Sequence, residues 1–464
     1  MDFITITYMK KIHWLLLVVS AVLYAVPFLL SAYLWWLIFA FPVALLYLVS
    51  VANVSFVHGY IWGCIFFGLH MSGGIYVVTC MAHDSWVVGV MLGLVMVLYQ
   101  ALFSGLVFCG VTKIISISSI TSPVMRLFMW TIGIWVLIVW TDWYSLWIFG
   151  VKEGYPLMHP LIPLAQNPTL LCLLPIIGKQ LLTLFLLLVP ASFVLLLRYK
   201  NNTGVFVFCS AIAFWFICWW VGRAEIQRFC WQARIRTLPY MAHSCVDNPL
   251  VVVKVVGSKL QKIIADYPEA EIVIMPESAF NVSNFNDFPE LLQLWNANNL
   301  GRAVHVVFGA SRWHEDCYYN SLHWVYNGVL QNCYDKRHAM LVSERLSSWM
   351  NNKTMQRVYF SNDFPIAISL DKRIKLALLP DISFVPYICS ELFFNEGPDD
   401  IYGESPIILV VNDSMFLGNW CVLYIQELLV LLARYKAIQW QRDIVYVSYG
   451  QSLFIDKHGL LKKI

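Results

Sequence analysis

The distribution of charged residues constrains the fold of this chain more than any other feature. Residues 1–222 contain long uncharged apolar runs, whereas residues 223–464 carry charged side chains throughout. Only 13% of the whole chain is charged, against about 25% in ordinary soluble domains. Long apolar runs without charge are what a bilayer accepts, because lipid offers charged groups no partner. We therefore predict a transmembrane helical bundle at 1–222 and a globular domain at 223–464.

Seven segments in the first part have the length of a membrane-spanning helix, about 17 to 25 residues. They are 12–30, 32–49, 56–78, 86–109, 127–149, 181–197 and 205–221. Under this assignment the basic residues of the short loops fall on one side of the membrane: Lys10, Lys11, Lys113, Arg126, Arg198 and Lys200. Lys and Arg collect on the cytoplasmic side. We expect residue 223 onward to lie outside, in the periplasm of a bacterial inner membrane.

The ionisable residues His70 and Asp142 fall within the predicted spans. Such residues mark lipid-headgroup or proton sites, or else they sit near the end of a span or pair inside the bundle. We favour the second interpretation, a position near a span end or a pair inside the bundle, for both residues. The proline-rich loop 153–180 is too interrupted to span a bilayer, and we expect it to lie at the outer interface or simply to connect two spans.

The second part of the chain alternates Val- and Ile-rich runs with stretches of helical periodicity. Strands are expected at 271–276, 303–310, 321–328, 373–379, 383–389, 407–413 and 443–449. Helices are expected at 250–265, 288–298 and 422–441. This alternation indicates an α/β domain whose sheets are covered by helices.

Three residues with complementary chemistry stand at or just after predicted strands. Glu277 follows "EIVIMP", Lys336 lies in "CYDKRHAMLVSE", and Cys389 ends "SFVPYIC". A thiol must lose its proton to attack, and a carboxylate can accept that proton. A Lys ammonium favours the thiolate and stabilises a developing oxyanion. Each residue alone is a weak signal, since a single buried Cys is usually inert, but together they form a coherent catalytic set.

Other chemistries find no support in the sequence. The 12 cysteines have no regular spacing and form no CxxC pair, so neither a disulfide framework nor a zinc site is predicted. No basic patch interleaved with aromatic residues is visible, and we expect no nucleic-acid partner. We also expect no cofactor and no metal.

These elements resemble the nitrilase, or carbon–nitrogen hydrolase, superfamily, whose Glu–Lys–Cys triad has the same chain order. "MPESAF" resembles its Pro-Glu element and gives Glu277 as general base. "YDKRHAMLVSE" resembles the lysine element, giving Lys336, with Glu344 as the second glutamate of the family. "ICSELFF" resembles the nucleophile element, with Cys389 as nucleophile and Glu391 as a carboxylate that braces the site through hydrogen bonds. "VVNDSMF" and "ARYKAIQWQRDIVYVSYG" resemble the strand and helix that follow.

With the predicted spans added, the chain resembles the apolipoprotein N-acyltransferases, which complete bacterial lipoprotein maturation. The resemblance implies about seven spans followed by an αββα sandwich domain. It also implies that an acyl chain passes from a phospholipid, through a thioester on Cys389, to the amine of a diacylglyceryl-cysteine. The expected partners are the phospholipid donor, a diacylated apolipoprotein and the bilayer, and we expect the protein to be a monomer.

The chain departs from this family at several positions. Ser390 stands where the family has Tyr, and Met415 stands where it has Trp. Met340 to Ser343 lack the Pro, Phe and Gly that usually precede the second glutamate, and the family adds one more span after the position where this chain stops. A membrane-tethered amidase or nitrilase-type hydrolase and an acyltransferase for another acceptor remain alternatives, because the acyl-enzyme step is shared. A non-catalytic scaffold is a further alternative, although no triad member is lost.

Overall fold

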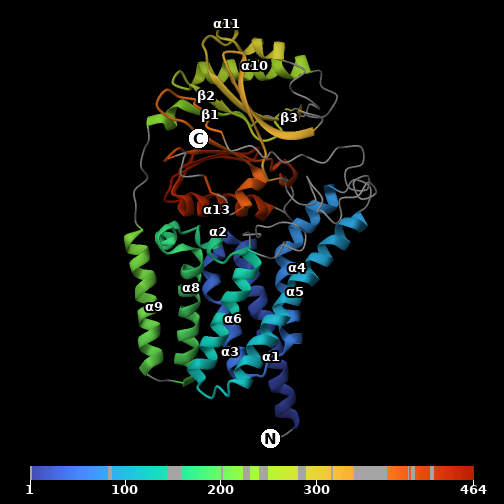
Figure 1. Cartoon of the computed structure of the whole chain (residues 1–464), viewed down its shortest axis with the longest axis vertical. Helices are drawn as coiled ribbons and strands as arrows, with labels where there is room; N and C mark the ends of the chain where they lie inside the picture. The colour runs from blue at the N-terminus through green and yellow to red at the C-terminus, as the bar shows by residue number, and fades with distance from the viewer. Residues whose placement is uncertain are drawn as a thin grey trace. The chain divides into compact units, whose positions relative to one another are not determined.

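The structure is a computed structural model of residues 1–464 (Figure 1). It describes residues 3–81, 86–143, 158–199, 202–222, 230–239, 249–280, 289–314, 317–338, 374–394, 397–398, 403–417 and 423–464. The chain divides into two compact units. The helical unit comprises Met1–Ala224 and Trp420–Tyr435, and the sheet unit comprises Glu225–Asn419 and Lys436–Ile464.

Long apolar helices dominate the helical unit. Its elements are α1 (Phe3–Leu29), α2 (Ser31–Leu34), η1 (Trp35–Phe39), α3 (Phe41–Val51), α4 (Phe56–Met81), α5 (Trp86–Ile117), α6 (Pro123–Trp143), α7 (Leu161–Leu164), η4 (Pro168–Leu171), α8 (Leu174–Tyr199) and α9 (Asn202–Val221). Among the described residues, four helices are long and apolar enough to cross a membrane: Lys11–Leu29, Gly89–Ile117, Pro123–Asp142 and Leu174–Arg198. Two shorter apolar helical stretches are Trp35–Val51, which combines η1 and α3, and Val207–Val221. The chain thus has several helices that can span a bilayer, while the count of seven stays a prediction.

One predicted span, 32–49, is not a single helix. The chain forms α2, then the 3-10 helix η1, and only then α3. Pro42 occupies the first turn of α3. Proline has no backbone N–H and is best accommodated in the first turn of a helix, which fits the start of α3 at this position.

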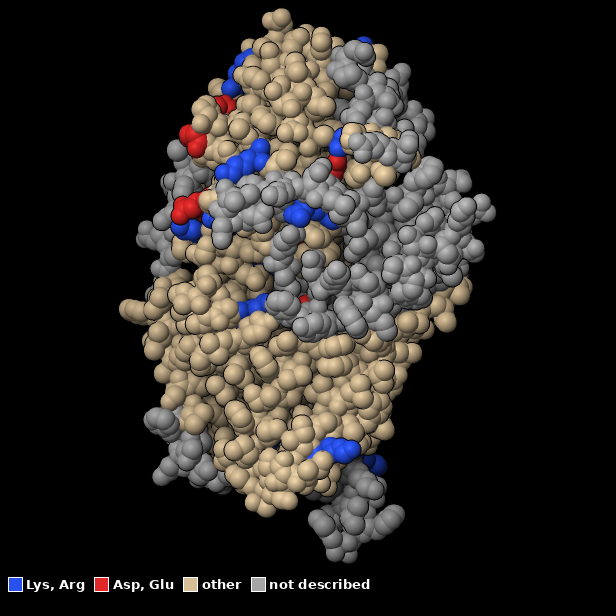
Figure 2. Space-filling model, in the orientation of Figure 1, with Lys and Arg blue, Asp and Glu red and all other residues tan. Residues whose placement is uncertain are grey.

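Basic residues gather at one end of the helical unit. α1 begins at this end, α5 ends and α6 begins there, and α8 ends there (Figure 1). The exposed residues Lys11, Lys113, Arg126 and Arg198 lie on these helix ends. On the face drawn in Figure 2, basic side chains lie at this end and the helices above it present uncharged side chains. Such an asymmetry is typical of the cytoplasmic end of a membrane bundle.

Asp142 near the end of α6 forms an ion pair with Lys179 of α8, and both side chains are buried in the helical unit. Lys179 follows Gly178, whose φ of +76° interrupts the helix and is a conformation that glycine adopts readily. Asp142 therefore pairs inside the bundle, as the sequence interpretation favoured. In the described part of the loop 153–180, Met158–Ala165 is buried, and its place at the outer interface stays a prediction. The hydroxyl of Tyr24 holds this segment by donating to the Met158 carbonyl at 3.1 Å.

The sheet unit contains two five-stranded sheets with the same plan. The first has the order β1-β2-β3-β4-β5 and the second β10-β9-β8-β7-β6. In each sheet the first two pairings along the chain are parallel and the last two are antiparallel. The strands are β1 (Ile235–Thr237), β2 (Ile272–Ile274), β3 (His305–His314), β4 (Cys317–Tyr326), β5 (Val329–Asp335), β6 (Val385–Ile388), β7 (Ile407–Val410), β8 (Ile444–Val447), β9 (Ser452–Ile455) and β10 (Leu461–Lys463). The remaining elements are η5 (Cys230–Arg234), α10 (Pro249–Asp266), η7 (Pro289–Trp295), α11 (Ala297–Leu300), η8 (Cys389–Phe393), η10 (Ser414–Phe416) and α13 (Leu423–Trp440).

Strand alternation divides the core of the sheet unit into layers. Ile272 and Ile274 of β2 join side chains of the second sheet in one apolar cluster, whereas Val273 between them packs toward α10. Successive side chains of a strand point to opposite faces, so one strand serves both layers.

The last turn of α13 belongs to the sheet unit, and Trp440 packs on Tyr387 of β6 with ring centroids 5.3 Å apart. The layers of the sheet unit are α10, the first sheet, the second sheet and the last turn of α13. This arrangement agrees with the expected α/β class.

Some predicted elements differ in the structure. The stretch 373–379 forms no strand among its described residues but a short return in which Leu376 and Phe384 pair, and its apolar side chains fill the core between the sheets. The helix expected at 288–298 is a 3-10 helix followed by α11, since the Asn296 side chain accepts from the Asn299 amide and starts a new helix. β1, β5, β9 and β10 were not expected, because they are short or carry exposed polar residues.

Candidate active site

Glu277 lies just beyond the end of β2, and the residue is 3% exposed. The next residue, Ser278, has a φ of +55°. Gly309 of β3 lies directly against this turn, and a Cβ at that position would be 2.6 Å from the Glu277 Cα. The chain therefore leaves the sheet at Glu277, and the absence of a side chain on Gly309 gives the turn its room.

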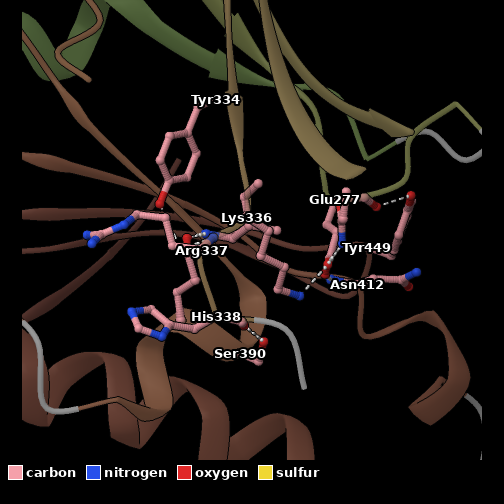
Figure 3. A network of polar contacts seen from close by, with 11 residues as sticks. Glu277, Tyr334, Lys336, Arg337, His338, Ser390, Asn412 and Tyr449 are labelled. Carbon is pink, nitrogen blue, oxygen red and sulfur yellow. Dashed lines mark hydrogen bonds and ion pairs between the residues drawn. The ribbon is translucent and has the colours of Figure 1, made fainter. Parts of the chain in front are cut away.

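Both carboxylate oxygens of Glu277 have donors (Figure 3). The Lys336 ammonium Nζ lies 3.1 Å from Oε1, and the Asn320 amide Nδ2 donates to the same oxygen at 2.7 Å. The backbone N–H of Asn412 donates to Oε2 at 2.8 Å. A buried charged group is tolerated only when it is paired and hydrogen-bonded. These contacts satisfy that condition for both members of the Glu277–Lys336 pair.

Lys336 follows β5 and is 1% exposed. Its backbone N–H donates to the Asn320 carbonyl at 2.9 Å, which fixes the chain where the side chain turns toward Glu277. The preceding residue, Asp335, instead pairs with Arg312, whose Nε donates to Oδ1 at 2.7 Å. The Ser321 hydroxyl donates to the same oxygen at 2.6 Å. Asp335 thus anchors the strand end that carries Lys336.

Cys389 stands where β6 ends and η8 begins, and its side chain is half-buried. Its φ is +43°, in the left-handed region that non-glycine residues seldom adopt. Residues in such conformations persist only where the surroundings hold them, and they cluster at functional sites. The backbone therefore turns sharply at Cys389, where the strand ends.

Glu391 ties the segments that carry Lys336 and Cys389. It is fully buried, and its Oε1 accepts from the Tyr334 hydroxyl at 2.7 Å and from the Arg337 N–H at 2.9 Å. Its Oε2 accepts from the Ile388 N–H at 2.7 Å. One carboxylate therefore binds residues adjacent to both Lys336 and Cys389.

Ser390 adds a second tie between the same segments. Its hydroxyl donates to the His338 carbonyl at 2.8 Å (Figure 3). The position where the resembled family has Tyr thus holds a small residue with a structural contact.

The structure brings Glu277 and Lys336 into direct contact and places Cys389, Ser390 and Glu391 on a segment linked to Lys336. Glu344 and Met340–Ser343 lie outside the described residues, as does the side chain of Met415. Half of the stretch 280–295 that follows Glu277, residues 281–288, is also outside them.

Sequence reasoning missed three residues that contact Glu277. Asn320 and Tyr449 were not singled out, and Asn412 appeared within "VVNDSMF" without a role. A polar residue within a buried strand was an available signal for Asn320, which is 7% exposed. Tyr449 donates its hydroxyl to the Glu277 carbonyl at 2.8 Å. Burial and the charges of Glu277 and Asp413 raise the pKa of Tyr449, so its hydroxyl keeps the proton it donates.

No family model and no curated protein matches this sequence. Among solved structures the chain is similar to a glutamine-dependent NAD⁺ synthetase from Acinetobacter baumannii, solved with adenosine diphosphate, with a TM-score of 0.34 and 14% identity over 49% of this chain and 42% of that one. It is also similar to a CN-hydrolase superfamily protein from Xanthomonas campestris with an arsenic adduct in its active site, with a TM-score of 0.34 and 19% identity over 48% and 84% of the two chains. A carbon–nitrogen hydrolase from Helicobacter pylori gives a TM-score of 0.35 and 11% identity over 49% and 82%. The chain thus spans less than half the length of the first of these proteins.

Proposed function

We propose that this protein is a membrane-bound acyltransferase that carries its acyl chain as a thioester on Cys389. The proposed donor is a phospholipid, and the proposed acceptor is the amine of a diacylglyceryl-cysteine at the start of an apolipoprotein. The observation that carries the proposal is the buried contact of Glu277 with Lys336 at 3.1 Å. Glu391 accepts from the Arg337 N–H, next to Lys336, and so links this pair to the segment in which Cys389 has a left-handed backbone.

The proposed first step is attack of the thiol on the phospholipid ester. Glu277 takes the Sγ proton of Cys389, and the thiolate adds to the ester carbonyl. The Lys336 ammonium and a backbone N–H near Cys389 stabilise the oxyanion. The carbon–oxygen bond then breaks, and the lysophospholipid leaves with the proton that Glu277 held.

The second step regenerates the enzyme. The acceptor amine adds to the thioester carbonyl while Glu277 takes one of its protons. The carbon–sulfur bond breaks, an amide forms, and the Cys389 sulfur regains a proton from Glu277. Glu344 is proposed to orient Glu277 or Lys336 during both steps. Glu391 is proposed to hold the segment that carries Lys336 in place against the segment that carries Cys389.

Membrane attachment suits this reaction because both proposed substrates are lipids. A site held at the bilayer surface meets them at a high effective concentration. The basic end of the helical unit supports a cytoplasmic position for that end. We accordingly propose that the sheet unit works on the periplasmic side of a bacterial inner membrane, and that the protein acts as a monomer.

An acyl-adduct experiment tests the proposal. Purified full-length protein is incubated with phospholipid vesicles, and its intact mass is measured. We expect one acyl adduct that hydroxylamine removes and that Cys389→Ala abolishes. Cys333→Ala is the matched control, because Cys333 lies on β5 of the same unit and should leave the adduct unchanged. A folded protein that never forms an adduct refutes the acyl-transfer mechanism.

A second stage identifies the acceptor. Addition of a diacylated lipopeptide should discharge the adduct and give a triacylated product. Release of free fatty acid instead would favour a membrane-tethered hydrolase.

A further inference from the structure

The Glu277 carbonyl is held by a residue outside the Glu–Lys–Cys set. The Tyr449 hydroxyl donates to this backbone oxygen at 2.8 Å, from the turn that joins β8 to β9 (Figure 3). The carbonyl lies beyond the end of β2, and the following residue, Ser278, has a positive φ. Backbone polar groups in an interior require partners wherever regular pairing ends. Tyr449 therefore supplies a donor at the point where the chain turns away from its sheet.

The turn that carries Tyr449 is itself fixed by one buried carboxylate. Asp413 is fully buried and accepts from the Ser448 hydroxyl at 2.8 Å and from the Tyr449 N–H at 2.9 Å. The Gly450 N–H donates to it at 3.2 Å. Three donors from consecutive residues leave this turn little freedom, so the position of the Tyr449 hydroxyl is set by Asp413.

Asp413 and its neighbour Asn412 act on Glu277 from two sides. The Asn412 N–H binds the Glu277 carboxylate directly at 2.8 Å, and Asp413 holds the turn whose tyrosine binds the Glu277 carbonyl. Two consecutive residues, Asn412 and Asp413, thus hold both the carboxylate and the backbone carbonyl of Glu277, the second through Tyr449. Lys336 and Asn320 add contacts only to the carboxylate. Among the described contacts of Glu277, the Tyr449 bond is thus the side-chain contact that controls its backbone.

We propose that Tyr449 is a positioning residue, whose hydroxyl fixes the peptide after Glu277 and so aims the carboxylate at the Cys389 thiol. Ser278, the residue after Glu277, has a positive φ and keeps this conformation only while its surroundings enforce it. Without the hydroxyl bond the peptide can relax, and the carboxylate direction changes with it. The inference rests on the proposed role of Glu277 as the base for Cys389.

Alkylation of Cys389 tests this inference without any lipid substrate. Full-length protein is treated with iodoacetamide at several pH values, and labelling of Cys389 is followed by peptide mass. For Tyr449→Phe we expect labelling near neutral pH to slow about tenfold, the size of effect that a lost hydrogen bond gives. The rise of labelling with pH should also shift from its wild-type position, in the same direction as in Glu277→Gln.

Tyr318→Phe is the matched control. It removes a tyrosine hydroxyl bond of the same unit, from Tyr318 to the Ser311 hydroxyl at 2.5 Å, and leaves Glu277 untouched. Ser448→Ala is a milder second variant that loosens the turn by removing one donor to Asp413. Its slowing should not add to that of Tyr449→Phe, because both act through the same turn.

The outcomes separate positioning from simple packing. If Tyr449→Phe and Ser448→Ala lower the melting temperature but keep the wild-type labelling rate and pH profile, the inference is wrong. A protein that shows the expected labelling profiles but never forms an acyl adduct would refute acyl transfer and leave the positioning role standing.

Discussion

Substitution of Gly309 by alanine probes the placement of Glu277 most directly. An added Cβ would lie 2.6 Å from the Glu277 Cα and 2.6 Å from the Ser278 backbone nitrogen. Both are backbone atoms, so no flexible side chain can move aside. Carbon atoms in good contact are about 3.5 to 4.0 Å apart, so the strand and the turn must separate by roughly 1 Å.

The cost of this separation follows from general magnitudes. Overpacking of a well-packed interior costs about 1 to 3 kcal/mol of unfolding free energy. A misplacement of about 1 Å in a catalytic group slows a reaction by about a hundredfold. We therefore expect Gly309→Ala to fold with reduced stability and to form the Cys389 acyl adduct about a hundredfold more slowly.

Gly257→Ala is the matched control. Gly257 lies inside α10, where an added Cβ would meet only the Trp295 ring at 3.5 Å, an ordinary contact. Replacing a helical glycine by alanine stabilises by about 0.5 to 1 kcal/mol. The assays are the rate of adduct formation by intact mass and the thermal melt. If Gly309→Ala acylates at the wild-type rate, the close approach does not position Glu277 and the reasoning fails.

Three further predictions follow from buried groups. Glu391→Leu removes the acceptor of three hydrogen bonds, two of them buried, and a lost buried bond costs about 1 to 3 kcal/mol. Its melting temperature should therefore fall sharply, and a melting temperature equal to that of the exposed-site control Glu404→Gln would contradict the bracing role. Burial, then the positive charge of Arg312, lowers the pKa of His323 to about 4. The unfolded chain binds this proton first, near its ordinary value of about 6.5, so stability should fall by about 3 kcal/mol as pH drops from about 6.5 to about 4. His323→Gln should flatten that slope in melts measured against pH, and an equally steep slope would refute the assignment. In the helical unit, Lys179→Met should lower the free energy of unfolding by about 3 to 5 kcal/mol, because it leaves the buried Asp142 charge without its ion-pair partner. Adding Asp142→Asn to this variant should restore part of the lost melting temperature. If the losses of the two single variants simply add in the double variant, the two residues do not form a direct pair.

Much of the architecture was predictable because its signals are local. A run of apolar residues without charge identifies a helix that can enter a bilayer, whatever its neighbours do. Val- and Ile-rich runs likewise predicted most strands of the two sheets. The short edge strand β10 and the 3-10 helix η7 escaped prediction, because their form depends on partners distant in sequence and on a local cap.

The sequence by itself determined the kinds of groups available at the site: a carboxylate, an ammonium and a thiol, each at or near a strand end. It also marked Glu391 as a carboxylate too costly to bury without a partner. Only the tertiary structure decided which partners those groups meet. Asn320, Asn412 and Tyr449 come from three other parts of the chain and converge on Glu277 because the two sheets pack face to face. Hydrogen bonds depend on distances of a few ångströms in space, and no periodicity along the chain records them.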